Sequence, residues 1–211
     1  MTSYAAVILA AGQASRYRQA GGAEPTKLIA PLDGEPLVRH VVRSALASMA
    51  RPVIVVTGHA ASDLVDALID LPVVCTHNPD FAQGLSTSLQ VGVSAVPPQC
   101  AGAIVLLADM PDIDSGTIDA MIEAAHVRPS ADAVVPVHGR QRGNPVLLSR
   151  SIFVRVAALQ GDVGARRLLN ETDISVEEVE RTAAILHDVD LPEDLAPLRC
   201  RTRSHPGTSA P

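Results

Sequence analysis

The chain has 211 residues, of which 47% are hydrophobic and 2% aromatic, and its formal net charge at pH 7 is −6. This length fits one domain with a single core, and the core must consist of Val, Leu, Ile and Ala because aromatic side chains are so few. The negative charge argues against a general nucleic-acid-binding protein, whose surface would carry an excess of Lys and Arg.

The cysteines and the N-terminal residues indicate in which cellular compartment the protein is expected. Cys75, Cys100 and Cys200 are scattered along the chain and show neither metal-ligand spacing nor a disulfide framework. The N-terminus has no signal-peptide pattern, and no apolar run approaches the ~20 residues that a membrane-spanning helix needs. We therefore expect a protein of the reducing cytoplasm that contacts neither membranes nor nucleic acids.

Apolar segments alternate between the periodicity of strands and that of helices. The first half of the chain predicts a strand over residues 5–9, a helix with Pro36 in its first turn that continues through Met49, a strand over 52–57, a helix over 62–69, a strand over 73–76 and a helix through Leu89, Val93 and Val96. The second half predicts a strand over residues 103–107, a helix through Ile118, Met121, Ile122 and Ala125, strands over 132–136 and 145–148, helices over 152–159 and 163–169, and strands over 174–179 and 185–189.

This alternation with short connections predicts a three-layer α/β/α sandwich, a Rossmann-like α/β fold whose sheet is mostly parallel. We expect residues 1–198 to form one domain and residues 199–211, which lack apolar periodicity, to be a disordered tail. Ligands of such sheets bind outside the carboxyl ends of the strands. The residues that follow each strand are therefore the candidates for function.

The loop after the first strand has the composition of a phosphate-binding loop. It reads Leu9-Ala-Ala-Gly-Gln-Ala-Ser-Arg16, and Lys27 follows. Small residues let the backbone approach a ligand, loop N–H groups point at phosphate oxygens, and Arg16 and Lys27 supply positive charge. The spacing is neither that of a Walker A loop nor that of G-x-G-x-x-G. A nucleoside triphosphate is therefore the expected ligand.

Two acidic positions complete the site. Asp109 directly follows the most apolar strand, where a charge is costly unless it is paired or binds a cation. Asp114 is the better candidate for capping the next helix, which leaves Asp109 for function. Asp190 follows a second apolar segment, whereas Glu193 and Asp194 fit a first helical turn. Asp109 and Asp190 therefore predict a site for Mg²⁺ or Mn²⁺ beside the phosphates.

In this order and spacing, the motifs resemble the MobA-like nucleotidyltransferases, and within them the molybdenum-cofactor cytidylyltransferases. The residues that carry the resemblance are the loop from Leu9 to Arg16, Lys27-Leu28, Gly34-Glu-Pro-Leu-Val38, Asn78, Gly84-Leu-Ser-Thr-Ser-Leu89, Leu107-Ala-Asp-Met-Pro111, Gly143-Asn-Pro-Val146, Gly161-Asp-Val-Gly-Ala-Arg166, Asp188-Val-Asp190 and Pro192-Glu-Asp-Leu195. The resemblance spans nearly the whole domain, about residues 7–195.

The resemblance implies a role for each site residue. Nucleotide binding falls to Leu9, Ala10, Ala11, Gly12, Arg16, Lys27, Gly84 and Ser86, acceptor binding to Ser88, Asn144, Asp162 and Arg166, metal binding to Asp109 and Asp190, and catalysis to Arg16, Lys27 and Asp109. Guanylyl-transferring relatives typically have Gly in place of Ala11, so Ala11 favours CTP over GTP.

The sequence departs from the family pattern at three positions. Ser15 stands one residue later than the usual serine of the loop, and Arg18 stands where Gly is usual. Arg18 is either an additional phosphate ligand or a surface residue, and we favour the surface. Asn144 replaces a frequent His, and because Asn does not titrate near neutral pH, acid–base work at this position is disfavoured.

The predicted reaction is transfer of CMP from CTP to the terminal phosphate of molybdenum-loaded molybdopterin, with release of pyrophosphate. The expected partner is a recipient molybdenum hydroxylase or its chaperone. One alternative is a nucleotidyltransferase that uses GTP or another phosphate acceptor, such as a sugar phosphate. A second alternative is a non-catalytic molybdopterin carrier, which would not need both aspartates.

Overall fold

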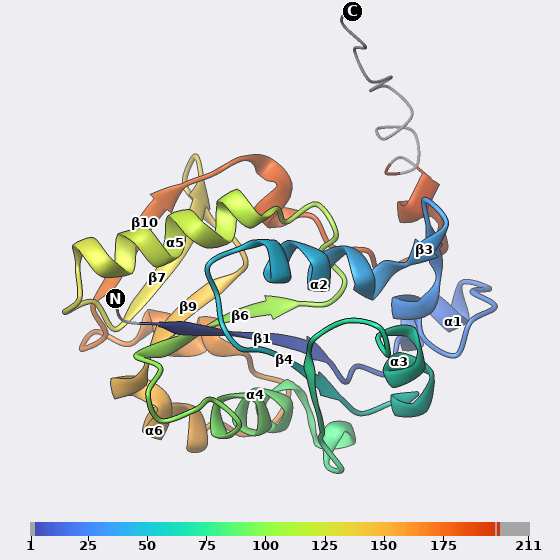
Figure 1. Cartoon of the computed structure of the whole chain (residues 1–211), viewed down its shortest axis with the longest axis horizontal. Coiled ribbons are helices and arrows are strands. Elements are labelled where there is room, and N and C mark those ends of the chain that lie inside the picture. The colour runs from blue at the N-terminus through green and yellow to red at the C-terminus, as the bar shows by residue number, and fades with distance from the viewer. Residues whose placement is uncertain (1–2, 197, 199–211) are drawn as a thin grey trace, which may run out of the picture.

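The computed structural model describes residues 3–196 and 198 (Figure 1). The expected tail over residues 199–211, together with Cys200, lies outside the described residues. Among the described residues, no helix is long and apolar enough to cross a membrane.

One large sheet forms the centre of the molecule. Its strands are β1 (Tyr4–Ala10), β4 (Val53–Thr57), β5 (Val74–His77), β6 (Gly102–Leu107), β7 (Ala133–His138), β8 (Gln141–Arg142), β9 (Val146–Ser149) and β10 (Val176–Glu180). They are ordered β10-β7-β9-β6-β1-β4-β5, and β8 pairs with β7. A separate hairpin joins β2 (Pro31–Leu32) to β3 (Glu35–Pro36).

The sheet is mostly parallel, as the sequence predicts. β1 lies parallel to β4 and β6, β5 continues beside β4, and β10 lies parallel to β7. β9 runs antiparallel between β6 and β7, and β8 is antiparallel to β7. The carboxyl ends of β1 and β6, which the register places side by side, therefore open at the same edge of the sheet.

Helices cover both faces of the sheet (Figure 1). The core side chains of α2 (Leu37–Ala47), α3 (Ala61–Ala67) and α5 (Ser115–Val127) belong to one face, and those of α4 (Leu85–Ser94) and α6 (Phe153–Ala157) to the other. The short α1 (Ser15–Gln19) follows the first loop. Short 3₁₀ helices are η1 (Lys27–Ile29), η2 (Phe81–Gln83), η3 (Arg150–Ile152), η4 (Ala165–Asn170), η5 (Ala183–Leu186) and η6 (Pro192–Asp194).

Strand β1 shows why two separate cores form. Successive strand residues point to opposite faces of a sheet. Ala6 and Ile8 accordingly pack in the core under α2 and α5, whereas Ala5 and Val7 pack in the core under α4 and α6. All residues of β1 are buried, which explains the uninterrupted apolar run in the sequence. The three-layer prediction is confirmed.

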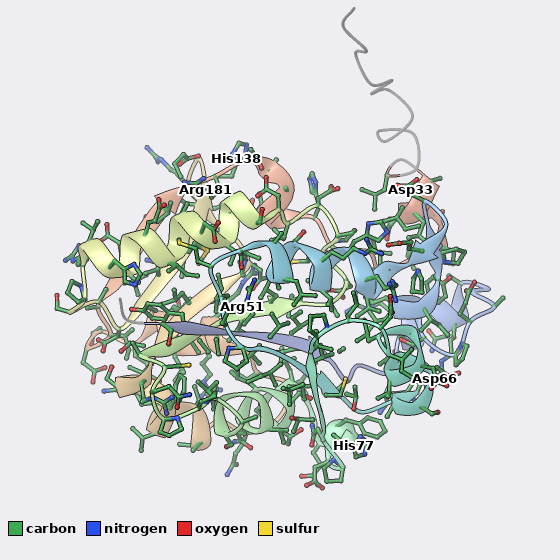
Figure 2. All side chains as sticks on the ribbon, in the orientation of Figure 1. Asp33, Arg51, Asp66, His77, His138 and Arg181 are labelled. Atoms are coloured by element: carbon green, nitrogen blue, oxygen red, sulfur yellow. The ribbon has the colours of Figure 1, made fainter. Side chains whose placement is uncertain are left out.

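Side chains satisfy backbone groups at two helix ends, of which the sequence predicts the first. The Asp114 carboxylate accepts a hydrogen bond of 2.7 Å from the Thr117 N–H and caps α5, as predicted. At the C-terminal end of α2, Arg51 donates to the carbonyl oxygens of Leu46 in the last helical turn and of Ser48 just after the helix (Figure 2). A guanidinium in this position compensates carbonyls that the helix itself leaves without a donor.

Several predicted elements are wrong in type or length. Pro36 does not lie in the first turn of α2; it pairs in β3 and precedes the helix, because its ψ of 136° is that of extended chain. The helix predicted over 152–159 lies over residues 150–157 and is a 3₁₀ turn, η3, followed by α6. The helix predicted over 163–169 is the 3₁₀ helix η4 and not an α-helix.

The strand predicted over residues 185–189 is also wrong. The segment begins in η5 and then runs as irregular chain. Its backbone bonds to loops rather than to a strand: the Ile185 carbonyl accepts from the Asn144 N–H, and the Val189 N–H donates to the Asp109 carbonyl. Ile185 and Val189 are nonetheless buried in the core, which accounts for the apolar pattern.

An ion pair between the first turn of α2 and the segment after α3 predicts an acid-sensitive contribution to stability. Arg39 donates to both carboxylate oxygens of Asp70, at 2.6 and 2.8 Å, and these hydrogen bonds lower the pKa of Asp70 from 3.8 to about 2. Because the pKa of Asp70 is lower in the folded than in the unfolded state, the pair stabilises the fold above about pH 4 and ceases to do so as the pH falls through 2.

Urea titrations from pH 5 to pH 2 measure this contribution. The free energy of unfolding of Asp70→Asn should fall less steeply over this range than that of the wild type. The exposed Asp66→Asn on α3 should follow the wild type, and equal slopes for all three proteins would refute this role.

Candidate active site

The loop after β1 faces open space. The Ala11 carbonyl accepts a hydrogen bond from the His59 N–H, which ties the loop to the segment after β4. Ala14 adopts a left-handed conformation with φ of 50° and begins α1. A Cβ atom placed on Gly12 would meet no heavy atom within 4 Å. The backbone at Gly12 is therefore open to a ligand, as the composition of the loop predicts.

This loop borders a pocket of about 620 Å³, which we call the phosphate pocket. Lining residues come from the ends of β1 and β6, from α1, from η1 and from the start of α4. They include Leu9, Ala11, Gly12, Arg16, Lys27, Gly84, Leu85, Ser88, Leu107, Asp109, Asp162 and Asp190. The structure thus brings both predicted cations and both predicted metal-ligating carboxylates to one pocket.

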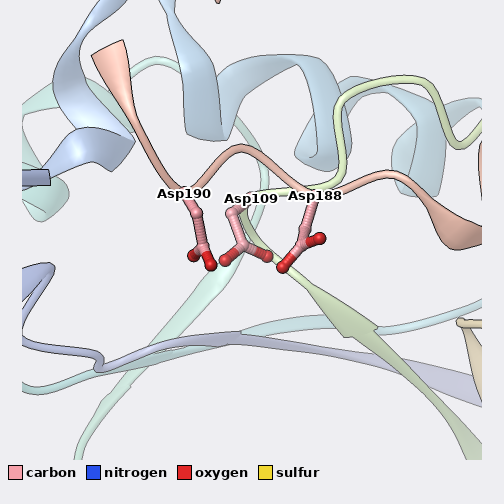
Figure 3. Close-up of side chains that lie close together, drawn as sticks. All are labelled: Asp109, Asp188 and Asp190. Carbon is pink, nitrogen blue, oxygen red and sulfur yellow. The ribbon is translucent and has the colours of Figure 1, made fainter. Parts of the chain in front are cut away.

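Three carboxylates form an acidic cluster beside this pocket (Figure 3). Asp109, Asp188 and Asp190 each have an oxygen within 4.8 Å of the others. Asp109 follows β6, and the backbone hydrogen bond of 2.9 Å from the Val189 N–H to the Asp109 carbonyl holds the two segments together. Val189 is buried, and the side chains of Asp188 and Asp190 on either side of it both point towards Asp109.

Two cations partly neutralise the acidic cluster. Lys27 Nζ lies 2.7 Å from Asp109 Oδ2 and 3.0 Å from Asp190 Oδ1, and Arg16 forms a further ion pair with Asp190. Burial opposes the charged form of Lys27, but the charges and hydrogen bonds of Asp109 and Asp190 outweigh it and raise the pKa of Lys27. Burial likewise opposes ionisation of Asp190, yet Lys27 and Arg16 hold its pKa below the usual value. Both partners are therefore charged at neutral pH.

The acidic cluster fits a divalent cation. Asp109 Oδ1 is buried and has no hydrogen-bond partner among the described residues, an unfavourable state that a cation would relieve. Three carboxylates face two positive side chains, so the group retains a formal negative charge. Carboxylate oxygens next to a polyphosphate are the ligands that Mg²⁺ prefers, and Mn²⁺ accepts the same donors.

A second pocket of about 330 Å³ adjoins the phosphate pocket, and we call it the acceptor-side pocket. The two pockets share the lining residues Leu9, Leu85 and Leu107. Its walls are mostly apolar, with the polar side chains Gln141, Asn144, Arg166 and Asp188 among the lining residues. Because Asp188 lines this pocket and Asp109 and Asp190 line the other, the acidic cluster lies where the two pockets adjoin.

A glycine lets the start of α4 approach the loop over residues 161–162 closely. Gly84 has a φ of 117°, and a Cβ atom on it would lie 2.4 Å from the Gly161 carbonyl carbon. The close approach lets the Ser86 N–H donate to the Gly161 carbonyl at 3.2 Å. The Leu85 N–H faces an oxygen of the Asp162 carboxylate at 3.4 Å. The first N–H groups of α4 therefore contact the loop over residues 161–162.

Some predicted site residues lie away from the expected place. The Ala10 side chain is buried in the core under α2, and the Ser86 hydroxyl is buried without a partner among the described residues. Neither residue is among those that line the phosphate pocket or the acceptor-side pocket. Ser88 and Asp162, expected beside the acceptor, line the phosphate pocket, and Ser88 accepts from the Asn78 amide. Asn144 and Arg166 line the acceptor-side pocket.

Asp188 and Gln141 are polar residues of the acceptor-side pocket that were not predicted as site residues. Asp188 stands two positions before Asp190, a spacing that puts both on one side of an extended segment, but it falls within the strand predicted over residues 185–189. Gln141 begins β8 and had no sequence signal of its own. Arg18 is exposed on α1 and forms no ion pair with another described residue, in keeping with the surface interpretation.

Comparison with known proteins identifies the family. Residues 6–178 match the model of the MobA-like NTP transferase domain. The chain belongs to this family. As a member of it, the chain is a nucleotidyltransferase, and the α/β neighbours in structure agree with the fold described above.

Two relatives in sequence and one solved structure are similar to this chain over most of its length. The molybdenum cofactor cytidylyltransferase of Escherichia coli K12 is 29% identical over 92% of this chain and 94% of its own length. The purine catabolism protein PucB of Bacillus subtilis 168 is 31% identical over 89% and 92% of the two chains. The crystal structure of Rv0371c from Mycobacterium tuberculosis H37Rv, solved as a complex with manganese, superposes with a TM-score of 0.76 at 25% identity, covering 93% of this chain and 98% of that chain.

Proposed function

We propose that this nucleotidyltransferase moves CMP from CTP to the terminal phosphate of molybdenum-loaded molybdopterin and releases pyrophosphate. The observation that carries the proposal is the acidic cluster at the junction of the phosphate pocket and the acceptor-side pocket. A reaction between two phosphates needs two binding spaces that meet at a site of charge neutralisation. The identity to the Escherichia coli cytidylyltransferase over nearly the full length of both chains supports this choice of substrates.

In this proposal the protein mainly positions the reactants. The phosphate nucleophile of the acceptor is already ionised at pH 7, so no general base is required, and no covalent enzyme intermediate is needed. Arg16 and Lys27 contact the triphosphate, whose leaving pyrophosphate carries developing negative charge. The backbone from Ala11 to Gly12 approaches the nucleotide, because no side chain of Gly12 stands in the way.

A divalent cation, Mg²⁺ or Mn²⁺, belongs to the proposal. Asp109 and Asp190 would hold it against the triphosphate, and Asp188 adds a third carboxylate from the acceptor side. When bound, the cation neutralises phosphate charge as a Lewis acid. The manganese complex of Rv0371c, a protein of the same fold with 25% identity, supports a divalent ion as ligand.

The donor and the acceptor of this proposal, CTP and molybdopterin, are tested by one assay. The assay measures pyrophosphate release with CTP or GTP, each with and without molybdenum-loaded molybdopterin. Release that requires both CTP and the pterin is the expected result. Release with GTP, or with another phosphate acceptor in place of the pterin, would favour a different nucleotidyltransferase reaction. We also expect delivery of the product to a molybdenum hydroxylase or its chaperone in the cytoplasm.

Arg166 gives a sharper test of the acceptor-side pocket. It lines this pocket and is exposed, so its guanidinium is free to pair with an anionic acceptor. Loss of a hydrogen bond to a charged group costs about 1.5–3 kcal/mol, so Arg166→Met should raise KM for the acceptor by roughly 10- to 100-fold and leave KM for CTP unchanged. The neighbouring Arg167, which lines a different groove, provides the control Arg167→Met. An equal effect of both substitutions, or a change confined to KM for CTP, would contradict this assignment.

A further inference from the structure

Lys27 occupies an unusual position in the acidic cluster. Its side chain is only 13% exposed, and its ammonium contacts oxygens of both Asp109 and Asp190, at 2.7 and 3.0 Å. These are the two carboxylates that fit a divalent cation beside the phosphate pocket. The ammonium therefore binds the same groups that the cation needs.

We propose that Lys27 is an internal counter-ion that competes with the divalent metal for Asp109 and Asp190, and that it moves to the triphosphate when metal and nucleotide bind together. The inference rests on the proposed metal dependence but not on the identity of donor or acceptor. Its consequence is that the metal binds weakly without nucleotide. Metal and nucleotide then bind cooperatively, because the nucleotide provides new partners for the displaced ammonium.

The charge arrangement supports this exchange. An ammonium and a divalent cation on the same carboxylates repel each other strongly, because the site is partly buried and poorly screened. Asp109 directs one oxygen to Lys27, while its other oxygen is buried without a partner among the described residues. The Asp109 carboxylate therefore has one oxygen for the Lys27 ammonium and one for a divalent cation. Binding both at the same time is unfavourable, because the two cations repel each other.

The exchange requires only side-chain movement. Lys27 begins η1, and the Thr26 hydroxyl accepts from the Leu28 N–H at 3.4 Å, which fixes the backbone at this turn. Lys27 lines the phosphate pocket, and its flexible four-carbon side chain has rotatable bonds for a move towards the phosphates. Arg16 is different, because its side chain is 75% exposed and pairs with Asp190 but not with Asp109.

The test is the affinity of nucleotide-free protein for Mn²⁺, measured from the electron paramagnetic resonance signal of the free ion. Lys27→Met should bind Mn²⁺ at least about tenfold more tightly than the wild type, since a like charge is removed from the site. Lys27→Arg, which keeps the charge, should stay near the wild type. Arg18→Met removes a positive charge from exposed α1 and should change the affinity less than twofold.

A second substitution shows where the ion binds. Adding Asp109→Asn to Lys27→Met should abolish the gain in Mn²⁺ affinity. Affinity of Lys27→Met equal to or below that of the wild type overturns the proposal, as does a gain that survives Asp109→Asn. Thermal unfolding first checks that each variant is folded, and Lys27→Gln replaces Lys27→Met if the latter is not. Failure of CMP transfer with CTP and the pterin would contradict the proposed function without altering this comparison.

Discussion

Asp109→Asn should lower kcat for nucleotidyl transfer by about 10²- to 10³-fold, the usual loss when one stabilising group is removed from a transition state. Asn keeps the size of the side chain but removes the charge that faces Lys27 and is proposed to bind the divalent cation. Because the carboxylate lies at the junction of the two pockets, the loss should appear in kcat rather than only in one KM. The measurement is pyrophosphate release with saturating Mg²⁺, CTP and acceptor.

The control for this substitution is Asp66→Asn. Asp66 is exposed on α3 and belongs to neither pocket (Figure 2). This variant loses the same charge from the surface and should retain wild-type kcat. Full Mg²⁺-dependent turnover by Asp109→Asn would rule out the role that we assign to Asp109. A lowered Tm of Asp109→Asn without loss of kcat would assign the carboxylate to stability instead.

Ile8→Ala should destabilise the fold by about 2–5 kcal/mol, the range for Ile→Ala substitutions in well-packed cores. Ile8 is fully buried in β1, the strand that lies between β4 and β6. Rigid strands on both sides prevent the cavity left by the Ile8 side chain from collapsing. The lost stability should therefore include the cost of that cavity as well as the transfer free energy of the removed atoms. Urea unfolding measures the change in free energy, with an expected fall of Tm of several degrees.

Ile69→Ala is the matched control for Ile8→Ala. Ile69 is 80% exposed after α3, and surface substitutions of this kind usually change stability by less than about 0.5 kcal/mol. A small effect at Ile8, similar to that at Ile69, would mean that β1 is not the packed centre of the sheet. The two measurements together therefore test whether the position of β1, and with it the loop that carries Gly12, is fixed by core packing.

Much of the fold follows from local sequence patterns. The apolar runs of β1, β4 and β6 predict buried parallel strands, and Asp114 predicts the start of α5 through its capping hydrogen bond. These features depend on residues that are near in sequence. The segment over residues 185–189 shows the limit of such patterns. Its buried side chains resemble a strand, but its hydrogen bonds are made to Asn144 and Asp109, which are distant in sequence.

The same distinction applies to the site. The sequence predicts that Asp109 is paired or binds a cation, because a charge directly after an apolar strand is otherwise costly, and the structure pairs it with Lys27. Asp188 was missed, because its position beside Asp109 depends on a backbone contact between distant segments. The division of residues between the two pockets was also unpredictable. Both pockets are lined by residues that are distant in sequence, and Leu9, Leu85 and Leu107 line the two together, so the division depends on tertiary contacts.

The most direct test of the proposed function follows the phosphorus atoms of the donor. The protein is incubated with Mg²⁺, molybdenum-loaded molybdopterin and CTP that carries a radioactive label at either the α- or the γ-phosphorus. We expect the α-label to appear in the pterin product together with cytosine, and the γ-label to appear only in released pyrophosphate. If the α-label remains in CTP, or if the γ-label is transferred to the pterin, this chain does not catalyse cytidylyl transfer to molybdopterin.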